Sequence, residues 1–359
     1  MTSRRPTVRD DLRALEGYHS AQVPAEVRLN TNESPYPPPE AWAASFAAAL
    51  EDVDWRRYPD RSAGALRSAI AAWHGVDPTQ VFAANGSNEV LQTLLLTYAG
   101  PGRSVMTFEP TYQLHAHLAR ISGARVIEVE RWADFNLDVD GAVRAVVAER
   151  PAITFLCSPN NPTGTVEPPS TVRRLLDVVS GLLIVDEAYV QFADQSAMDL
   201  VDEDQPLVVV RTMSKTWSLA ALRLGYLIGP TWLIADLERV VLPYHLDAAE
   251  QLAGRLALDH VAEMDARVKL IVAERERLVE ELAGMPIDVF PSGANFVLLR
   301  PRTMDGHDVW RGLVERGVLV RDCSRWPRLA GCLRVTVGTP EEDDRFIVAL
   351  RDVIGTLPA

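Results

Sequence analysis

Lysine is almost missing from this 359-residue sequence, which has only Lys215 and Lys269 among its 36 basic residues. Arginine stays protonated at any working pH and cannot form an imine, whereas a lysine amine can lose its proton and attack an aldehyde. Schiff-base chemistry would therefore have two candidate residues. Lys269 lies in MDARVKLIVAERERL, a predicted helix with charges on one face, which favours an ordinary surface position for it.

Cysteine and long apolar runs are also scarce. The three cysteines include no CxxC pair, which argues against a disulfide framework or a zinc site and favours a reducing, cytoplasmic location. No apolar run is long enough to span a bilayer, and no apolar stretch follows the first arginines as in a secretory signal. The net charge of −13 argues against a nucleic-acid-binding or membrane-binding surface.

The length and the residue pattern predict an α/β protein with two domains. Short apolar runs (SVMTF, RVIEV, ITFLC, LLIVD and LVVV) alternate with helical patterns between about residues 40 and 240. Such runs are typical of parallel strands buried on both faces. We expect an N-terminal arm over 1–37 that packs on the small domain, a large domain with a mainly parallel sheet over 38–247, and a smaller α+β domain over 248–359.

One candidate binding site lies in FAANGSNEVLQTLLL, where Gly86, Ser87 and Asn88 begin a predicted helix. Free backbone N–H groups and the helix dipole at such a position suit a phosphate group. An ordinary capped helix start explains the same residues. This motif alone therefore leaves both interpretations open.

Asp186 directly follows the apolar run LLIV, at the carboxyl end of a predicted strand, where α/β proteins place their ligands. A carboxylate there could pair with a buried cation, coordinate magnesium, or simply form a turn. The magnesium interpretation would imply an ATPase, which needs a GxxxxGK[ST] loop. The sequence contains no Gly-Lys pair, so an ATPase is disfavoured.

A second polar cluster follows the run LVVV, where Thr212, Ser214 and Lys215 stand close together and Arg223 comes eight residues after the lysine. Two hydroxyls, an amine and a guanidinium suit a ligand that carries both a phosphate and an aldehyde. Asn161, in CSPNNPTG, precedes a proline, and such a bond can be cis and direct a side chain into a site. A simple Pro/Gly turn is the alternative.

The ordered motifs GSNE, PTY, SPNNPTG, VDEAY and SK with Arg223 resemble the class I/II aminotransferases of pyridoxal-phosphate (PLP) fold type I. LEGYHS, LNTNESPYP, RYPD, SGANFV and LRVTVGT extend the resemblance, toward the histidinol-phosphate aminotransferases, over nearly the whole chain. The resemblance implies a ping-pong transamination in histidine biosynthesis, through an aldimine between PLP and Lys215. It also implies a homodimer with shared active sites.

The resemblance also implies individual roles. Asp186 would pair with the pyridine nitrogen of PLP, which keeps the ring an electron sink. The other expected cofactor contacts are Asn161 and Tyr189 at the ring oxygen, Tyr112 on the ring face, and Gly86, Ser87, Asn88, Thr212, Ser214 and Arg223 at the phosphate, with Tyr58 reaching it from the partner subunit.

Arg334, in CLRVTVG, would bind the anionic group of the substrate, because a guanidinium grips either a carboxylate or a phosphate. Arg321, Tyr18 and Asn32 are further candidates for the substrate pocket, and surface ion pairing is the alternative for both arginines. Trp217 and the segment DCSRWPRLAGC depart from the expected family pattern, and we expect both near the substrate mouth.

Three alternatives stay open at this point. An aromatic amino-acid aminotransferase and a threonine-phosphate decarboxylase share the expected fold and cofactor. A non-catalytic PLP-binding regulator would need a DNA-binding domain, for which the arm before residue 30 is too short.

His115 and His117 are spaced as a metal pair would be, but no third ligand accompanies them, so we interpret them as packing or exposed residues.

Overall fold

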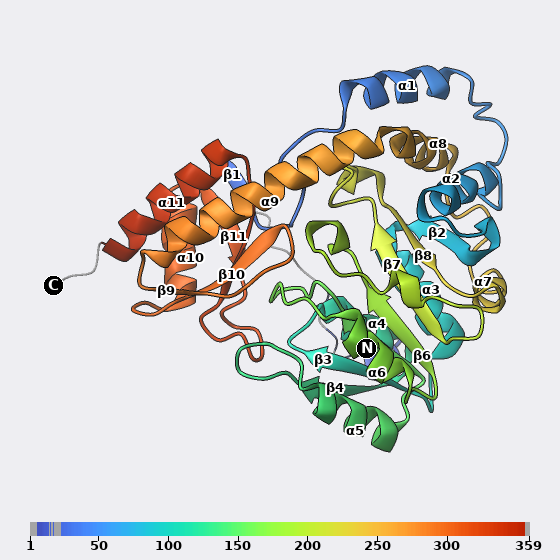
Figure 1. Ribbon diagram of the computed structural model, residues 1–359, viewed down its shortest axis with the longest axis horizontal. Helices are drawn as coiled ribbons and strands as arrows, with labels where there is room; N and C mark the ends of the chain where they lie inside the picture. The colour runs from blue at the N-terminus through green and yellow to red at the C-terminus, as the bar shows by residue number, and fades with distance from the viewer. Residues whose placement is uncertain (1–5, 14, 16, 18–22, 356–359) are drawn as a thin grey trace, which may run out of the picture.

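The computed structural model describes residues 6–13, 15, 17 and 23–355. Two β-sheets, each with helices packed against it, lie side by side, and the long helix α9 (Val261–Ala283) runs from one to the other (Figure 1). Among the described residues, no helix is long and apolar enough to cross a membrane.

The larger sheet has seven strands in the order β2-β8-β7-β6-β5-β3-β4. The strands from β7 to β4 run parallel, and β8 is antiparallel to both of its neighbours. The predicted mainly parallel sheet is thereby confirmed. The strand bounds are β2 (Val81–Asn85), β3 (Ser104–Glu109), β4 (Arg125–Glu130), β5 (Ile153–Cys157), β6 (Leu182–Asp186), β7 (Leu207–Thr212) and β8 (Leu224–Ile228).

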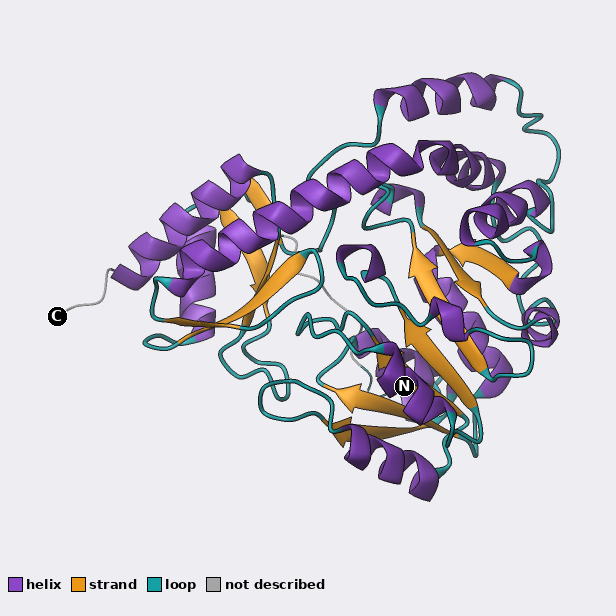
Figure 2. Ribbon diagram, viewed as in Figure 1, coloured by secondary structure: helices purple, strands orange, loops and turns teal. Residues whose placement is uncertain are grey.

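Helices cover both faces of this sheet (Figure 2). Alternate residues of the central strands point to opposite faces, so that Ile184 packs with α3, α4 and α7 while Val185 packs with α5 and α6. The bounds are α1 (Glu40–Glu51), α2 (Gly64–His74), α3 (Gly86–Tyr98), α4 (Gln113–Ser122), α5 (Val139–Glu149), α6 (Pro169–Leu176), α7 (Thr231–Leu237) and α8 (Ala248–Ala257).

The smaller sheet has five strands in the order β1-β11-β12-β10-β9, and β1 reaches it from the N-terminal part of the chain. An apolar core lies between this sheet and α9, α10 and α11. The bounds are β1 (Val27–Leu29), β9 (Ile287–Val289), β10 (Phe296–Pro301), β11 (Val318–Asp322), β12 (Leu333–Thr336), α10 (Gly306–Glu315) and α11 (Pro340–Gly355).

Short 3-10 helices complete the described chain at Asp10–Leu12, Pro78–Gln80, Val190–Phe192, Met198–Leu200, Ala220–Leu222 and Leu258–His260. The expected domain boundary at residue 247 stays a prediction, although α8 begins at the next residue.

The expectation that Trp217 lies at the substrate mouth is wrong. Its side chain is 2% exposed and packs edge-on against Trp73, with ring centroids 5.3 Å apart, in the core that α2 and α8 share with the large sheet. A large indole ring is better accommodated in this core than at an open pocket, because burial removes its apolar surface from water.

Candidate active site

A cavity of about 370 Å³ lies where the carboxyl ends of β6 and β7 face the smaller sheet. Most of the residues predicted for the site line this cavity, although they come from distant parts of the sequence. They are Asn32, Ser87, Asn88, Tyr112, Asn161, Asp186, Tyr189, Thr212, Ser214, Lys215, Arg223, Arg321 and Arg334.

Two of the predicted site residues that the structure describes do not line the cavity. Gly86 lies just behind it, at the start of α3. Tyr58 is 81% exposed and stacks on Tyr244, with ring centroids 4.6 Å apart. Tyr18 lies outside the described residues.

Lys215 follows β7 and reaches across the cavity, where its Nζ donates a hydrogen bond to the backbone oxygen of Thr31 at 3.0 Å. Burial and the nearby positive charge of Arg334 lower the pKa of the Lys215 amine to about 7, and Arg223 adds to the effect. A substantial fraction of this amine is therefore unprotonated near neutral pH. Lys269, in contrast, is exposed on α9, as expected.

Asp186 ends β6 and is 2% exposed. Its Oδ2 lies 2.9 Å from Nε2 of His115, and its Oδ1 accepts the backbone N–H of Ala188 at 3.1 Å. The His115 ring in turn stacks flat on Phe155, with centroids 4.4 Å apart. A buried carboxylate with these partners suits a protonated ring nitrogen of a ligand.

Sequence reasoning missed the role of His115 because the pattern His-x-His suggested only metal binding or packing. The structure shows that His115 holds a site residue 71 positions away. Thr31 was also missed. Neither residue carries a local sequence signal for its contact.

A cradle for an anion forms at the start of α3, where Ser87 and Asn88 face Ser214 and Arg223. The Arg223 Nη1 donates to the Ser214 Oγ at 3.3 Å, which brings two polar groups of the cradle together. Gly86 adopts φ +74°, and an added Cβ would lie 2.7 Å from the Arg223 Nη2. Only glycine therefore allows the guanidinium to approach the helix start this closely.

Asn161 and Tyr189 line the same cavity as Lys215 and Asp186. The Asn161 Oδ1 accepts a hydrogen bond from the Arg334 Nη1 at 2.5 Å, which leaves its NH₂ group as a donor for a ligand. The Tyr189 hydroxyl accepts a hydrogen bond from the Asn32 amide at 2.9 Å. Burial raises the pKa of the Tyr189 hydroxyl well above its ordinary value.

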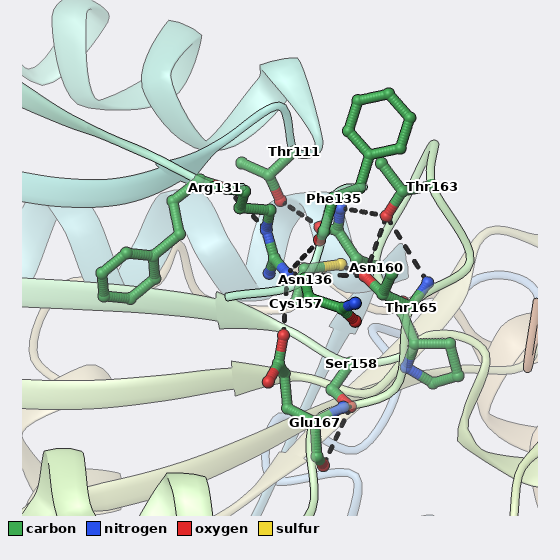
Figure 3. Close-up of polar contacts among 12 residues, drawn as sticks. Thr111, Arg131, Phe135, Asn136, Cys157, Ser158, Asn160, Thr163, Thr165 and Glu167 are labelled. Atoms are coloured by element: carbon green, nitrogen blue, oxygen red, sulfur yellow. Dashed lines mark hydrogen bonds and ion pairs between the residues drawn. The ribbon is translucent and has the colours of Figure 1, made fainter. Parts of the chain in front are cut away.

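The loop that carries Asn161 is held by a buried polar network (Figure 3). The Arg131 Nη1 pairs with Glu167 at 2.7 Å and also donates to Thr165. From Thr165 the hydrogen bonds continue through Thr163 to Asn160, the neighbour of Asn161. This network links the loop to the residue that follows β4.

Arg321 and Arg334 are directly opposite each other on β11 and β12. Both are largely buried, at 9% and 6% exposed. Each guanidinium lies over an aromatic ring, Arg334 over Phe296 at 5.2 Å and Arg321 over Trp326 at 4.9 Å. Two buried cations that line one cavity suit an anionic group of the substrate.

Trp326 belongs to the segment 322–333, which we expected near the substrate mouth. The residues of this segment, all of which the structure describes, do not line the cavity. Trp326 nevertheless packs against the guanidinium of the cavity residue Arg321. The segment also reaches the larger sheet, because Arg328 pairs with Glu128 and Glu130 on β4.

Comparison with known proteins agrees with this geometry. The sequence profile of the family described as aminotransferase class I and II matches residues 24–350. A histidinol-phosphate aminotransferase of Frankia casuarinae is 43% identical over 358 residues, which cover 96% of this chain and 89% of the relative.

Solved structures show the same fold. The histidinol-phosphate aminotransferase of Sinorhizobium meliloti, in complex with pyridoxal-5'-phosphate, matches with a TM-score of 0.85 and 22% identity, over 93% of this chain and 92% of the other. The L-threonine-O-3-phosphate decarboxylase of Porphyromonas gingivalis matches with a TM-score of 0.80 and 21% identity, over 92% and 100%. The fold alone does not separate these two activities, but the matched profile and the close relative agree: this chain belongs to the class I and II aminotransferases.

Proposed function

We propose that this aminotransferase converts histidinol phosphate and 2-oxoglutarate to imidazole-acetol phosphate and glutamate, in histidine biosynthesis, with PLP as its cofactor. The observation that carries the proposal is the pair of buried guanidiniums, Arg321 and Arg334, that lines the same cavity as Lys215. One such pair can take the phosphate of the first substrate and, after it leaves, a carboxylate of the second.

The residues of the cavity fit PLP. The cradle of Ser87, Asn88, Ser214 and Arg223 suits its phosphate, and the buried Asp186 suits its pyridine nitrogen. Asn161 and Tyr189 suit the ring oxygen. When bound, PLP supplies an aldehyde that joins to amines and a ring that withdraws electrons from the substrate.

The chain itself contributes proton transfer and position. Lys215 can release and take up a proton near neutral pH because its pKa is lowered to about 7, so it suits transfer of the proton at the substrate Cα. Asp186, fixed by His115, would hold the pyridine nitrogen of bound PLP in its protonated form. Arg334, fixed by Asn161 and by the backbone oxygen of Asn30, orients the substrate.

Steady-state assays of the purified enzyme test the proposal. With 2-oxoglutarate as acceptor, we expect histidinol phosphate to have a kcat/KM at least about a hundredfold above that of phenylalanine. The reason is that only histidinol phosphate carries a phosphate that both arginines can bind. Threonine phosphate should not be decarboxylated. Turnover of phenylalanine or threonine phosphate without turnover of histidinol phosphate would refute the proposed substrate.

The proposal includes a homodimer with shared active sites. Trp55, Tyr58, Leu242 and Tyr244 are 65%, 81%, 72% and 42% exposed, and Tyr58 stacks on Tyr244. Large side chains exposed in this number are typical of a surface that a partner covers. A net charge of −13 disfavours a nucleic acid as that partner.

Sedimentation of a Leu242→Asp variant tests this surface. A buried carboxylate at the interface should shift the protein from dimer to monomer at micromolar concentration. Val348→Asp is the matched control, since Val348 is 59% exposed on α11, in the small domain. A wild-type protein that sediments as a monomer would contradict the dimer.

We also assign the enzyme to the cytoplasm, since its three cysteines are unpaired and buried.

A further inference from the structure

The segment 30–33 crosses the cavity between the two sheets, and its residues contact the site in the order of the sequence. The Asn30 backbone oxygen accepts a hydrogen bond from the Arg334 Nη2 at 2.9 Å. The next backbone oxygen, of Thr31, accepts one from the Lys215 Nζ. Glu33 comes two residues later and also lines the cavity.

This order matches the order of the groups in the proposed substrate. Histidinol phosphate carries its phosphate on one arm of Cα, its amine on Cα and its imidazole on the other arm. With the phosphate at Arg334 and the amine at Lys215, the imidazole arm extends away from Arg334. Glu33, two residues after Thr31, lines the cavity within electrostatic reach of Lys215.

Glu33 is chemically suited to an imidazole. Apart from Asp186, its carboxylate is the one acidic group that lines the cavity among the described residues. Glu33 is exposed at the cavity, and its Oε2 accepts a hydrogen bond from the Thr31 hydroxyl at 2.7 Å. Within the described part of the chain, the structure shows no hydrogen bond to its Oε1.

We propose that Glu33 is a specificity residue that accepts a hydrogen bond from the imidazole ring of the substrate. The inference rests on the proposed function. An imidazole presents an N–H donor in its neutral form and two in its charged form, so a carboxylate binds both forms. A phenyl ring of similar size offers no donor and gains nothing from Glu33.

The test combines an enzyme variant with a substrate variant. Glu33→Gln keeps the size of the side chain and removes its charge, and phenylalaninol phosphate keeps the amine and phosphate of histidinol phosphate but replaces the imidazole by a phenyl ring. We expect kcat/KM for histidinol phosphate to fall about tenfold in the variant, chiefly through KM. For phenylalaninol phosphate the change should stay within about twofold.

The matched control is Glu40→Gln, because Glu40 is an exposed acid at the start of α1 that does not line the cavity. Glu40→Gln should leave kcat/KM unchanged for both substrates. Thermal melting should show that both variants are folded. Equal losses for the two substrates would mean that Glu33 acts on Lys215, which lies within its electrostatic reach, and would overturn the inference.

Unchanged kinetics for both substrates would overturn the inference as well. The proposed function fails separately, in the wild type: if the unaltered enzyme does not turn over histidinol phosphate, both ideas fall. If the wild type does turn it over and the variant shows no selective loss, only the inference falls.

Discussion

At the scale of single residues, the chemistry of the site depends on groups that shift the pKa of a neighbouring side chain or fix its position. The Lys215 amine is the clearest case, because burial and the positive charge of Arg334 lower its pKa from 10.5 to about 7. The ordinary lysine amine is almost fully protonated at neutral pH and would react slowly with an aldehyde. The fold therefore leaves a substantial fraction of this amine unprotonated at neutral pH before any ligand is bound.

This shift predicts how cofactor uptake depends on pH. The unprotonated amine is the reactive form, and its fraction rises as the pH passes upward through the lowered pKa. The rate of PLP uptake by the apoenzyme, followed by absorbance, should therefore rise between about pH 6 and pH 8 and then level off. In Arg334→Gln the profile should move to higher pH. A rate that keeps rising toward pH 10 in the wild type would contradict the shift.

His115 predicts a second effect at this scale. His115→Phe keeps an aromatic ring on Phe155 but removes the hydrogen bond to Asp186. A hydrogen bond to a charged group contributes about 1.5–3 kcal/mol, so PLP affinity and kcat should each fall at least about tenfold. His117→Phe, on the same helix, is the control and should have little effect. Normal cofactor affinity in His115→Phe would show that the contact is unimportant.

At the scale of elements, the loop between β5 and α6 has its conformation set by the buried pair of Arg131 and Glu167 (Figure 3). The side chain of Arg131 is fully buried and that of Glu167 is 7% exposed. Loss of one partner from such a pair leaves the other charge without compensation. The loop that carries Asn161 should therefore depend on both residues together.

Arg131→Met should destabilise the protein by about 3 kcal/mol, because Glu167 stays buried without its cation. The double variant Arg131→Met with Glu167→Gln should recover much of this loss, since no buried charge remains. Urea unfolding of the wild type and the variants measures the difference. Equal stability of the single and the double variant would show that the charge pair is not the cause.

At the scale of the whole molecule, the proposed shared site makes a prediction about mixed dimers. Lys215→Ala removes the amine proposed to react, and Tyr58→Ala removes the group proposed to reach the cofactor phosphate of the partner. Each variant alone should be nearly inactive. In a hybrid dimer, one of the two sites would combine an intact Lys215 with an intact Tyr58.

Random reassociation of equal amounts of the two variants makes half of the dimers hybrids with one intact site each, so activity should recover to about a quarter of the wild-type value. Unmixed variants treated in the same way are the control. No recovery, with hybrid dimers demonstrated by a tagged subunit, would mean that each site is built from one subunit.

The sequence alone determined the fold class and singled out Lys215 as the lysine proposed to react. Strands buried on both faces must be continuously apolar, so ITFLC, LLIVD and LVVV could be recognised directly. Two strands of the same sheet, β2 and β8, were not predicted, because VFAAN and LGYLI adjoin polar motifs or an arginine that obscure their pattern. Lys215 stood out because only two lysines occur.

The tertiary structure decided which groups act together. The contacts of His115 with Asp186 and of Arg334 with Asn30 join residues 71 and 304 positions apart. The register of β11 with β12 places Arg321 opposite Arg334, and packing buries Trp217 in the core instead of at the cavity. Such contacts depend on how the sheets and helices pack in space, and a local residue pattern carries no information on that packing.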